Sequence, residues 1–156
     1  MHPEFLHFNR PLMMRYVTLA SRLLVGALFI LSGFVKANDP LGFSYKMDEY
    51  FLVFGLPFLQ IISLYLSVLI CIAEIVLGVA VLAGIAIRRT SLLLVFLNLF
   101  FAFLTFYSAW FNKVTDCGCF GDAVKLTPWE SFAKSVALMV LILIIFSRRG
   151  TIASLF

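Results

Sequence analysis

Two cysteines separated by a single glycine stand out in the last third of this chain, in the polar segment Asp116-Cys117-Gly118-Cys119-Phe120-Gly121-Asp122. Neighbouring thiols on a loop with glycines can cycle between dithiol and disulfide, whereas a cysteine kept for packing is usually solitary and buried. Gly118 eases closure of the small ring because glycine adopts backbone conformations that other residues avoid. We therefore predict that Cys117 and Cys119 are the catalytic residues of a redox site.

Two other interpretations of this cysteine pair compete with redox cycling. The cysteines could be inert, or they could hold a metal. Two thiolates provide only half of the ligands of a closed zinc site, although a soft thiolate pair suits Cu(I). Redox cycling is favoured over both, and no metal site is predicted.

A second group of polar residues, Arg22, Glu74 and Asn98, lies inside long apolar stretches. Ionisable side chains in a membrane are costly and usually face the interior of a helix bundle or pair with one another. The rise per residue of a helix puts these three at similar depths, so we expect an Arg22–Glu74 ion pair that fixes helix packing. The functional alternative is a proton site or a cofactor site for a quinone head group. Cys71, one turn before Glu74, is expected to be structural.

The composition places these residues in a membrane protein. Hydrophobic residues make up 63% of the 156 positions, charged residues 13%, and the mean hydropathy is +1.07. Four stretches reach the roughly 20 residues that cross a hydrocarbon core about 30 Å thick: 16–35, 58–87, 90–110 and 129–147. We predict an all-α fold, a four-helix transmembrane bundle that forms a single integral membrane domain over residues 1–156, with the lipid bilayer as its surroundings.

The first span could also be read as a signal peptide. Basic residues precede its apolar run, and Val35-Lys36-Ala37 has the small-residue spacing of a signal-peptidase site. The apolar region extends back to Tyr16, however, which makes a span of full length. We therefore expect the first helix to be retained, and the overlong second span to tilt or to project from the membrane.

A short interfacial helix is predicted between spans one and two. Asp39 can cap its start and Pro40 suits its first turn, while Gly55 and Pro57 provide a stop. Its charged and apolar residues fall on different faces, so it should lie along the membrane surface. It is either an ordered connector or a lid for the cysteine loop.

The fourth span opens with Thr127-Pro128-Trp129-Glu130, the pattern of a capping box with proline at the first helical position. Trp129 and, at the end of span three, Trp110 suit the interfacial aromatic belt. The cysteine loop between them is therefore expected close to the membrane surface, where it could meet both a soluble partner and a lipid-dissolved carrier.

The orientation follows from the basic residues near the span ends. Six lie on one side, Arg10, Arg15, Arg88, Arg89, Arg148 and Arg149, and five lie on the other, Lys36, Lys46, Lys113, Lys125 and Lys134. The positive-inside rule then places both termini in the cytoplasm and the Cys-Gly-Cys loop in the periplasm of a bacterial inner membrane, where disulfides form. The net charge of +4 is spread over loops, which does not favour nucleic-acid binding.

With these residues in view, the chain resembles the DoxX and MauE group of small membrane proteins. The first two spans are similar to the DoxX signature at Arg22, Gly26, Phe29, Ser32, Gly33, Lys36, Glu74, Gly78 and Gly84, and the segment from Asp116 to Gly121 is closer to the MauE branch. The resemblance implies a four-helix bundle and a link to thiol or quinone redox processes. MauE-like proteins are associated with maturation of methylamine dehydrogenase, and DoxX relatives with thiosulfate-to-quinone electron transfer or oxidative-stress complexes.

Four-helix thiol oxidases of the quinone-linked type, such as DsbB and vitamin K epoxide reductase, use two cysteine pairs, whereas this chain has one. A thioredoxin-like partner or a direct exchange with a quinone would have to complete the circuit. We thus predict a membrane thiol–disulfide redox protein, an oxidoreductase or a subunit of one, that passes reducing equivalents between periplasmic thiols and a quinone or thioredoxin-like partner. The alternatives are a non-catalytic scaffold or maturation factor that recruits a redox enzyme, and a copper-handling protein.

Overall fold

A computed structural model describes residues 4–111 and 127–150, with side chains from residue 13 onward. Its described elements are helices: α1 (Glu4–Asn38), α2 (Pro40–Val53), the 3-10 helix η1 (Pro57–Ile62), α3 (Ser63–Ala83), α4 (Ile87–Phe111) and α5 (Pro128–Ser147). Four segments are long and apolar enough to cross a membrane: Met13–Asn38, Pro57–Ala83, Ile87–Phe111 and Pro128–Ser147. The predicted all-α fold with four membrane-spanning helices is confirmed.

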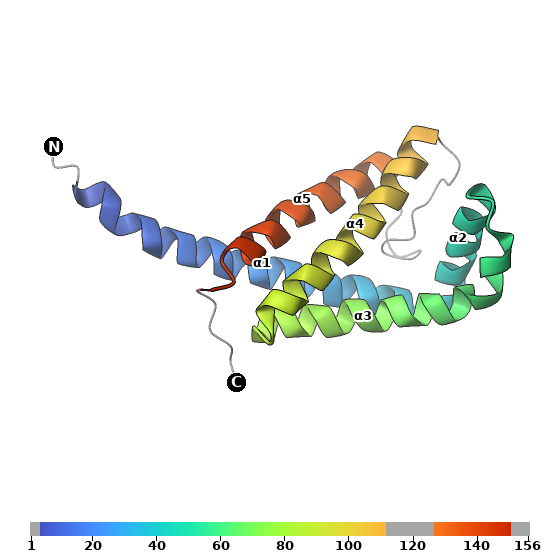
Figure 1. The fold of residues 1–156 in the computed structure, drawn as a ribbon, viewed down its shortest axis with the longest axis horizontal. Helices are drawn as coiled ribbons and strands as arrows, with labels where there is room; N and C mark the ends of the chain where they lie inside the picture. Colours follow the sequence, from blue (N-terminus) through green and yellow to red (C-terminus); the bar gives the residue numbers. More distant parts are fainter. Residues whose placement is uncertain (1–3, 112–126, 151–156) are drawn as a thin grey trace.

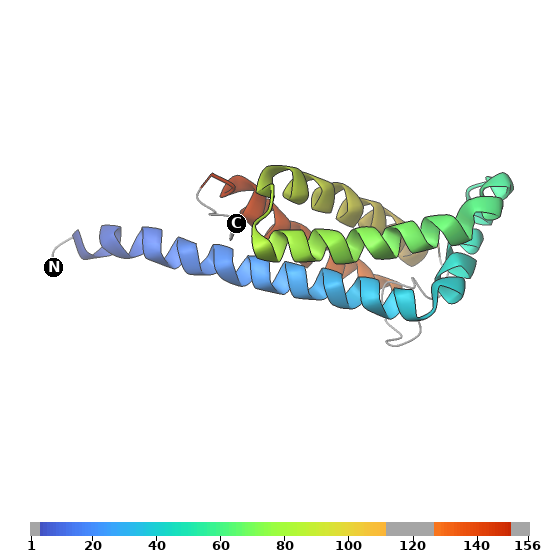
Figure 2. The ribbon, with the colours of Figure 1, turned by 90° about the horizontal axis from the view of Figure 1, so that it is seen from below.

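The bundle is built from two pairs of helices. α1 runs alongside α3, and α4 packs on α5, while contacts between the two pairs are fewer (Figure 1). α2 crosses one end of the bundle, and the N-terminal part of α1 projects beyond the opposite end (Figure 2). We refer to these as the α2 end and the projecting end.

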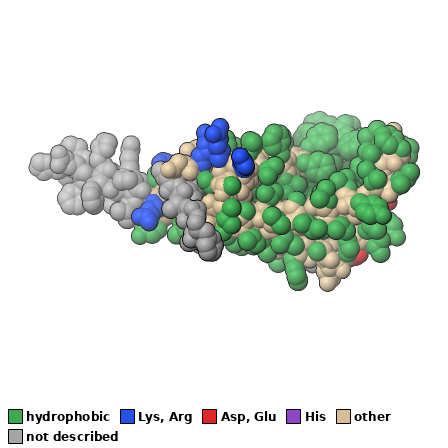
Figure 3. Space-filling model, turned by 60° about the horizontal axis from the view of Figure 1, so that its bottom comes forward, with side chains coloured by type: hydrophobic (Ala, Val, Ile, Leu, Met, Phe, Trp, Pro, Cys, Tyr) green, Lys and Arg blue, Asp and Glu red, His purple; other side chains and the backbone are tan. Residues whose placement is uncertain are grey.

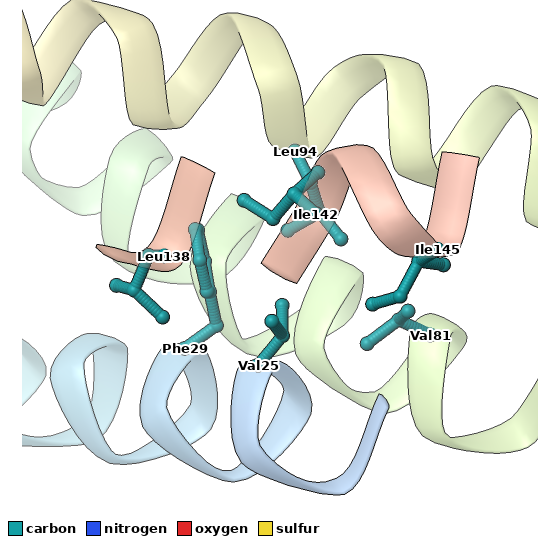
Figure 4. Close-up of a cluster of buried hydrophobic side chains, with 7 residues drawn as sticks. All are labelled: Val25, Phe29, Val81, Leu94, Leu138, Ile142 and Ile145. Carbon is teal, nitrogen blue, oxygen red and sulfur yellow. The ribbon is translucent and has the colours of Figure 1, made fainter. Parts of the chain in front are cut away.

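An apolar core joins the two pairs in the half of the bundle away from α2. Val25 and Phe29 of α1 meet side chains from the other three long helices (Figure 4), and the full cluster comprises Val25, Phe29, Val81, Leu94, Leu138, Ile142 and Ile145. Many other large apolar side chains are exposed on the outer surface of the bundle. This is the distribution expected for helices whose outward faces meet lipid.

Glycines let α1 and α3 approach one another closely. A Cβ added to Gly78 would lie 2.9 Å from the carbonyl oxygen of Gly26, and a Cβ added to Gly33 would lie 2.9 Å from that of Cys71. Small residues at such positions allow membrane helices to pack backbone against backbone. These contacts fix the register between the two helices, and this register places the polar residues described below.

The short helix predicted between the first two spans is present as α2. The Asp39 carboxylate accepts a hydrogen bond from the Gly42 amide at 2.9 Å, and Pro40 occupies the first helical position. The Ser67 hydroxyl of α3 donates to the Pro40 carbonyl at 2.9 Å, which ties the start of α2 to the bundle. Gly55, with φ of 70°, follows the end of the helix. Two of the signals read from the sequence, the Asp39 cap and Pro40, therefore act as expected.

The second predicted span, 58–87, differs from the observed helix. Residues Pro57–Ile62 form the 3-10 helix η1, and α3 ends at Ala83 because Gly84 takes a left-handed conformation with φ of 71°. The residues that made the predicted second span too long therefore form η1 at its start and the short connection between α3 and α4 at its end. The start of α5 matches the sequence: the Glu130 carboxylate accepts from the Thr127 amide at 2.8 Å in a capping box.

Candidate functional site

Cys117 and Cys119 lie outside the described residues, so their role stays a prediction. The helices on either side of them are described: α4 ends at Phe111, and α5 begins at Pro128. Both of these helix ends lie toward the α2 end of the bundle (Figure 1). Cys71, in contrast, lies within the described residues. It is a free, buried cysteine of α3, as expected for a packing cysteine.

A buried ion pair joins Lys36 of α1 to Glu74 of α3. The Lys36 ammonium donates to Glu74 Oε1 at 2.7 Å, to Glu74 Oε2 at 2.8 Å and to the Ser32 hydroxyl at 2.9 Å. The two side chains are only 1% and 3% exposed. The ammonium also lies 4.5 Å from the centroid of the Phe101 ring and 5.3 Å from that of Phe43. The cation is therefore enclosed by a carboxylate, a hydroxyl and two aromatic rings.

The local sequence explains why Lys36 reaches Glu74. Gly33 lets α1 approach α3 next to Glu74: a Cβ added to Gly33 would lie 3.0 Å from the Glu74 Cβ. Side chains on a helix point back toward its N-terminus, so the Lys36 side chain folds toward Ser32, one turn earlier on the same face. This pairing was not predicted from the sequence, because Lys36 stands with the basic residues near the span ends, which were used only for the orientation and the family resemblance. Lys36 lies four residues after Ser32, on the same face of the helix, and this spacing is the signal that could have indicated an inward-facing lysine.

The predicted Arg22–Glu74 ion pair is wrong. Arg22 instead donates from Nε to the Val81 carbonyl at 3.1 Å and from Nη2 to the Leu82 carbonyl at 2.8 Å. These carbonyls belong to the last turn of α3, about 10–12 Å along the helix from Glu74 at the rise of an α-helix. The expectation of similar depth failed because the glycine contacts set an antiparallel register in which Arg22 lies level with the end of α3. Arg22 therefore adds a charged donor to carbonyls in the last turn of α3, where helical hydrogen-bond partners run out. The Val81 carbonyl also accepts from the Gly84 amide at 3.3 Å.

Asn98 does lie at the site. Its side-chain amide donates to the Ser135 carbonyl of α5 at 2.9 Å, so it links α4 to α5 inside the bundle. Glu74 and Asn98 face one pocket, together with Lys36 and with Lys134, which interacts electrostatically with Glu74. The structure thus brings together two of the three residues of the predicted cofactor site and adds two lysines.

The pocket lies between the two helix pairs and has a cavity volume of about 30 Å³. All four long helices contribute to its lining, which consists of Leu28, Phe29, Ser32, Lys36, Glu74, Asn98, Phe101, Lys134, Ser135 and Leu138. Apolar groups make up most of the lining surface, and ammonium, amide, hydroxyl and carboxylate groups lie among them. Such a lining can bind water or a small oxygen-bearing group, and can hold or move a proton.

The chain is similar to part of a longer protein. A relative, Protein TlpB of Flavobacterium psychrophilum, is 27% identical over 136 residues, which cover 84% of this chain and 36% of TlpB. The chain therefore spans about a third of the length of that relative. No solved structure matches significantly.

The family comparison covers most of the chain. Residues 14–148 match the family described as methylamine utilisation protein MauE. This range covers the four membrane-spanning helices, apart from the first residue of the first span. The predicted resemblance to this family is confirmed, and with its four apolar helices the protein is a multi-pass membrane protein. The chain belongs to the MauE family.

Proposed function

We propose that this protein is a membrane thiol–disulfide redox protein whose working pair is Cys117 and Cys119. The observation that carries the proposal is the position of the Cys-Gly-Cys segment in the chain, between the end of α4 and the start of α5. Lys134 lies six residues into α5, about 9 Å along the helix. The polar pocket therefore lies in the half of the bundle to which the cysteine segment is attached.

The proposed exchange is a standard thiol–disulfide reaction. A thiolate of a partner protein attacks the Cys117–Cys119 disulfide, which forms a mixed disulfide and releases one thiol. The partner's second thiol resolves the mixed disulfide, so that the partner leaves oxidised and Cys117 and Cys119 are both reduced. Two electrons and two protons have then passed to this chain. The reverse sequence, from a reduced pair to an oxidised partner, uses the same steps.

Reoxidation needs an acceptor, for which we propose a thioredoxin-like disulfide or a membrane quinone that takes up two electrons and two protons to become a quinol. Glu74 and Asn98 would belong to the carrier or proton site, since both line the pocket inside the bundle. Arg22 is removed from that site because its guanidinium is engaged by the end of α3. Lys36 and Lys134 replace it as the cationic groups.

We further propose that the protein lies in a bacterial inner membrane with both termini in the cytoplasm. Lys and Arg side chains gather toward the projecting half of the bundle, whereas the visible acidic side chains lie near the α2 end (Figure 3). Arg88 and Arg89 follow the α3–α4 connection, and Arg148 and Arg149 follow α5. The positive-inside rule supports placing these arginines in the cytoplasm. The cysteine segment would then face the periplasm.

Single serine variants test the proposed exchange. Cys117→Ser and Cys119→Ser should each remain folded in the membrane and lose exchange. One of the two should accumulate a mixed disulfide, because its remaining cysteine can attack the disulfide of an oxidised partner while the second thiol of the pair, which would release that partner, is absent. Cys71→Ser is the control and should retain exchange, since Cys71 is buried among the helices. The readout is a reductant-sensitive adduct on a non-reducing gel, identified by mass spectrometry.

Two other outcomes would replace the proposal. Normal pathway output from the Cys117→Ser/Cys119→Ser double variant would indicate a scaffold or maturation factor that recruits a redox enzyme. Stoichiometric Cu(I) that is lost on either single substitution, without a mixed disulfide in either, would indicate a copper-handling protein.

A further inference from the structure

The pocket between the helix pairs has the size and the lining of a small hydration site. A cavity needs about 10–15 Å³ to hold one water molecule, provided that two to four polar groups surround it. This cavity has about 30 Å³, and its mostly apolar lining includes the polar side chains of Glu74, Asn98, Lys134 and Ser135. Room for about two water molecules therefore exists beside a carboxylate in the interior of the bundle.

Glu74 lines this pocket and retains hydrogen-bonding capacity. A carboxylate has about four lone-pair sites. The Lys36 ammonium occupies two of them, one on each oxygen, and the Ser32 hydroxyl also hydrogen-bonds to Glu74. The Lys36 ammonium, in contrast, has used its three hydrogens on Glu74 and Ser32. Of this ion pair, Glu74 is the partner that can accept a further hydrogen bond from water.

The groups around Glu74 come from all four long helices. Lys36 and Ser32 face it from α1, Lys134 from α5 and Asn98 from α4, while Cys71 lies one turn earlier on α3 itself. The two lysines stabilise the carboxylate, and the ion pair spans the contact between α1 and α3. An ion pair that is packed on all sides would hold its carboxylate away from water, whereas Lys36 and Glu74 line a cavity to which all four long helices contribute polar side chains.

We propose that this pocket is hydrated and that Glu74 exchanges a proton through it with the aqueous phase at the α2 end of the bundle. In the release step the carboxyl O–H bond breaks, the proton passes to a pocket water, and the carboxylate is held by Lys36. In the uptake step the pocket water returns a proton, and the O–H bond forms again. No electrons move in either step. The use of this proton in redox turnover rests on the proposed function, since two protons accompany each pair of electrons in thiol–disulfide exchange.

Infrared difference spectroscopy tests the proton exchange directly. The full chain, reconstituted in phospholipid bilayers, is subjected to steps in pH, and the carboxyl C=O bands that appear are compared in H₂O and D₂O. We expect a band that shifts in D₂O, is lost in Glu74→Gln and is retained in Glu49→Gln. Glu49 is the matched control because it pairs with Lys46 at 3.4 Å on the exposed face of α2. A band set unchanged by Glu74→Gln would overturn the proposal.

A second variant tests the path and does not alter the ion pair. Ser135→Val adds a methyl group to the lining, and we expect deuteration of the Glu74 carboxyl to slow by about tenfold, which corresponds to a barrier raised by about 1.4 kcal/mol. Ser131→Val is the control, because Ser131 is buried one turn earlier on α5 and does not line the pocket. Equal deuteration rates in Ser135→Val and the unmodified chain would contradict proton exchange through a hydrated pocket. This test holds even if Glu74→Gln fails to fold.

The same spectra on the Cys117→Ser/Cys119→Ser variant separate this inference from the proposed function. We expect the Glu74 band to persist in that variant. A persistent band together with unimpaired pathway output would contradict only the thiol-exchange function. Normal thiol exchange in a protein that lacks a Glu74 band would contradict only the proton pocket.

Discussion

Lys36 and Glu74, 38 positions apart in the chain, form a hydrogen-bonded ion pair with both carboxylate oxygens within 2.8 Å of one ammonium. The pair connects the end of α1 to the middle of α3 and lies at the polar edge of the pocket shared with α4 and α5. Taking two charges out of water is expensive, and the cost is offset only when the geometry is good and the remaining hydrogen-bonding groups are satisfied. The stability of the bundle should therefore depend on keeping this pair intact.

Removing one charge of the pair should be strongly destabilising. Glu74→Gln leaves the Lys36 ammonium buried without its carboxylate, and we expect the free energy of unfolding to fall by about 3–5 kcal/mol. Lys36→Met combined with Glu74→Gln should recover most of this loss, because no uncompensated charge remains. Denaturant titration of the protein in mixed micelles, followed by circular dichroism, measures both changes.

The exposed pair on α2 provides the control for this experiment. Lys46 and Glu49 lie 3.4 Å apart, and the Glu49 side chain is 48% exposed. Lys46→Met should change the unfolding free energy by no more than about 1 kcal/mol, as is usual for surface pairs. A Glu74→Gln protein as stable as the unmodified chain would show that the buried pair contributes nothing to the fold.

The close contact of α1 and α3 leads to a second prediction. Gly78→Ala places a methyl group 2.9 Å from the Gly26 carbonyl oxygen and 3.0 Å from the Ile30 amide nitrogen, and neither backbone atom can move independently of its helix. Overpacking costs about 1–3 kcal/mol, which on balance exceeds the gain of up to about 1 kcal/mol in helix propensity.

We therefore expect Gly78→Ala to lower the unfolding free energy. Gly150→Ala is the control, since an added Cβ there meets nothing within 4 Å. A stabilising effect of Gly78→Ala would mean that α1 and α3 lie farther apart than the structure shows.

The fold was largely predictable because its signals are local. Apolar stretches, the Asp39 cap and the capping box at Thr127 each act within a few residues, and all of these were found from the sequence. The partner of Glu74 was not predictable in this way. It depends on the register of α1 against α3, which the glycine contacts set, and on the direction in which the Lys36 side chain leaves its helix.

The same distinction applies to the candidate site. Glu74 and Asn98 were identified because polar residues in apolar helices are conspicuous, whereas Lys36 and Lys134 were overlooked because they lie near the ends of their spans. Only the assembled bundle shows that these four residues, from four helices, border one pocket. Cys117 and Cys119 lie outside the described residues, and their selection stays a prediction from residue type and spacing.

Thiol labelling tests the proposed orientation. After mild reduction of intact cells, a membrane-impermeant maleimide should modify Cys117 or Cys119 and leave Cys71, which is 2% exposed, unmodified. The Cys117→Ser/Cys119→Ser variant should show no labelling and serves as the control. Modification of the loop cysteines only after the inner membrane has been opened would invert the orientation, and with it the argument that the pair faces an oxidising compartment.

Arg22 should stabilise the bundle independently of Glu74. Arg22→Met removes two hydrogen bonds to the Val81 and Leu82 carbonyls, at 3.1 and 2.8 Å, from a charged donor that also complements the negative end of the helix dipole. Hydrogen bonds from charged groups contribute about 1.5–3 kcal/mol, so we expect a loss in this range, whereas the exposed Arg15→Met should be nearly neutral. Because Arg22 and Glu74 share no partner, the effects of Arg22→Met and Glu74→Gln should add to within about 0.5 kcal/mol in a double-mutant cycle. A coupling energy well above that value would restore the Arg22–Glu74 pair that the structure excludes.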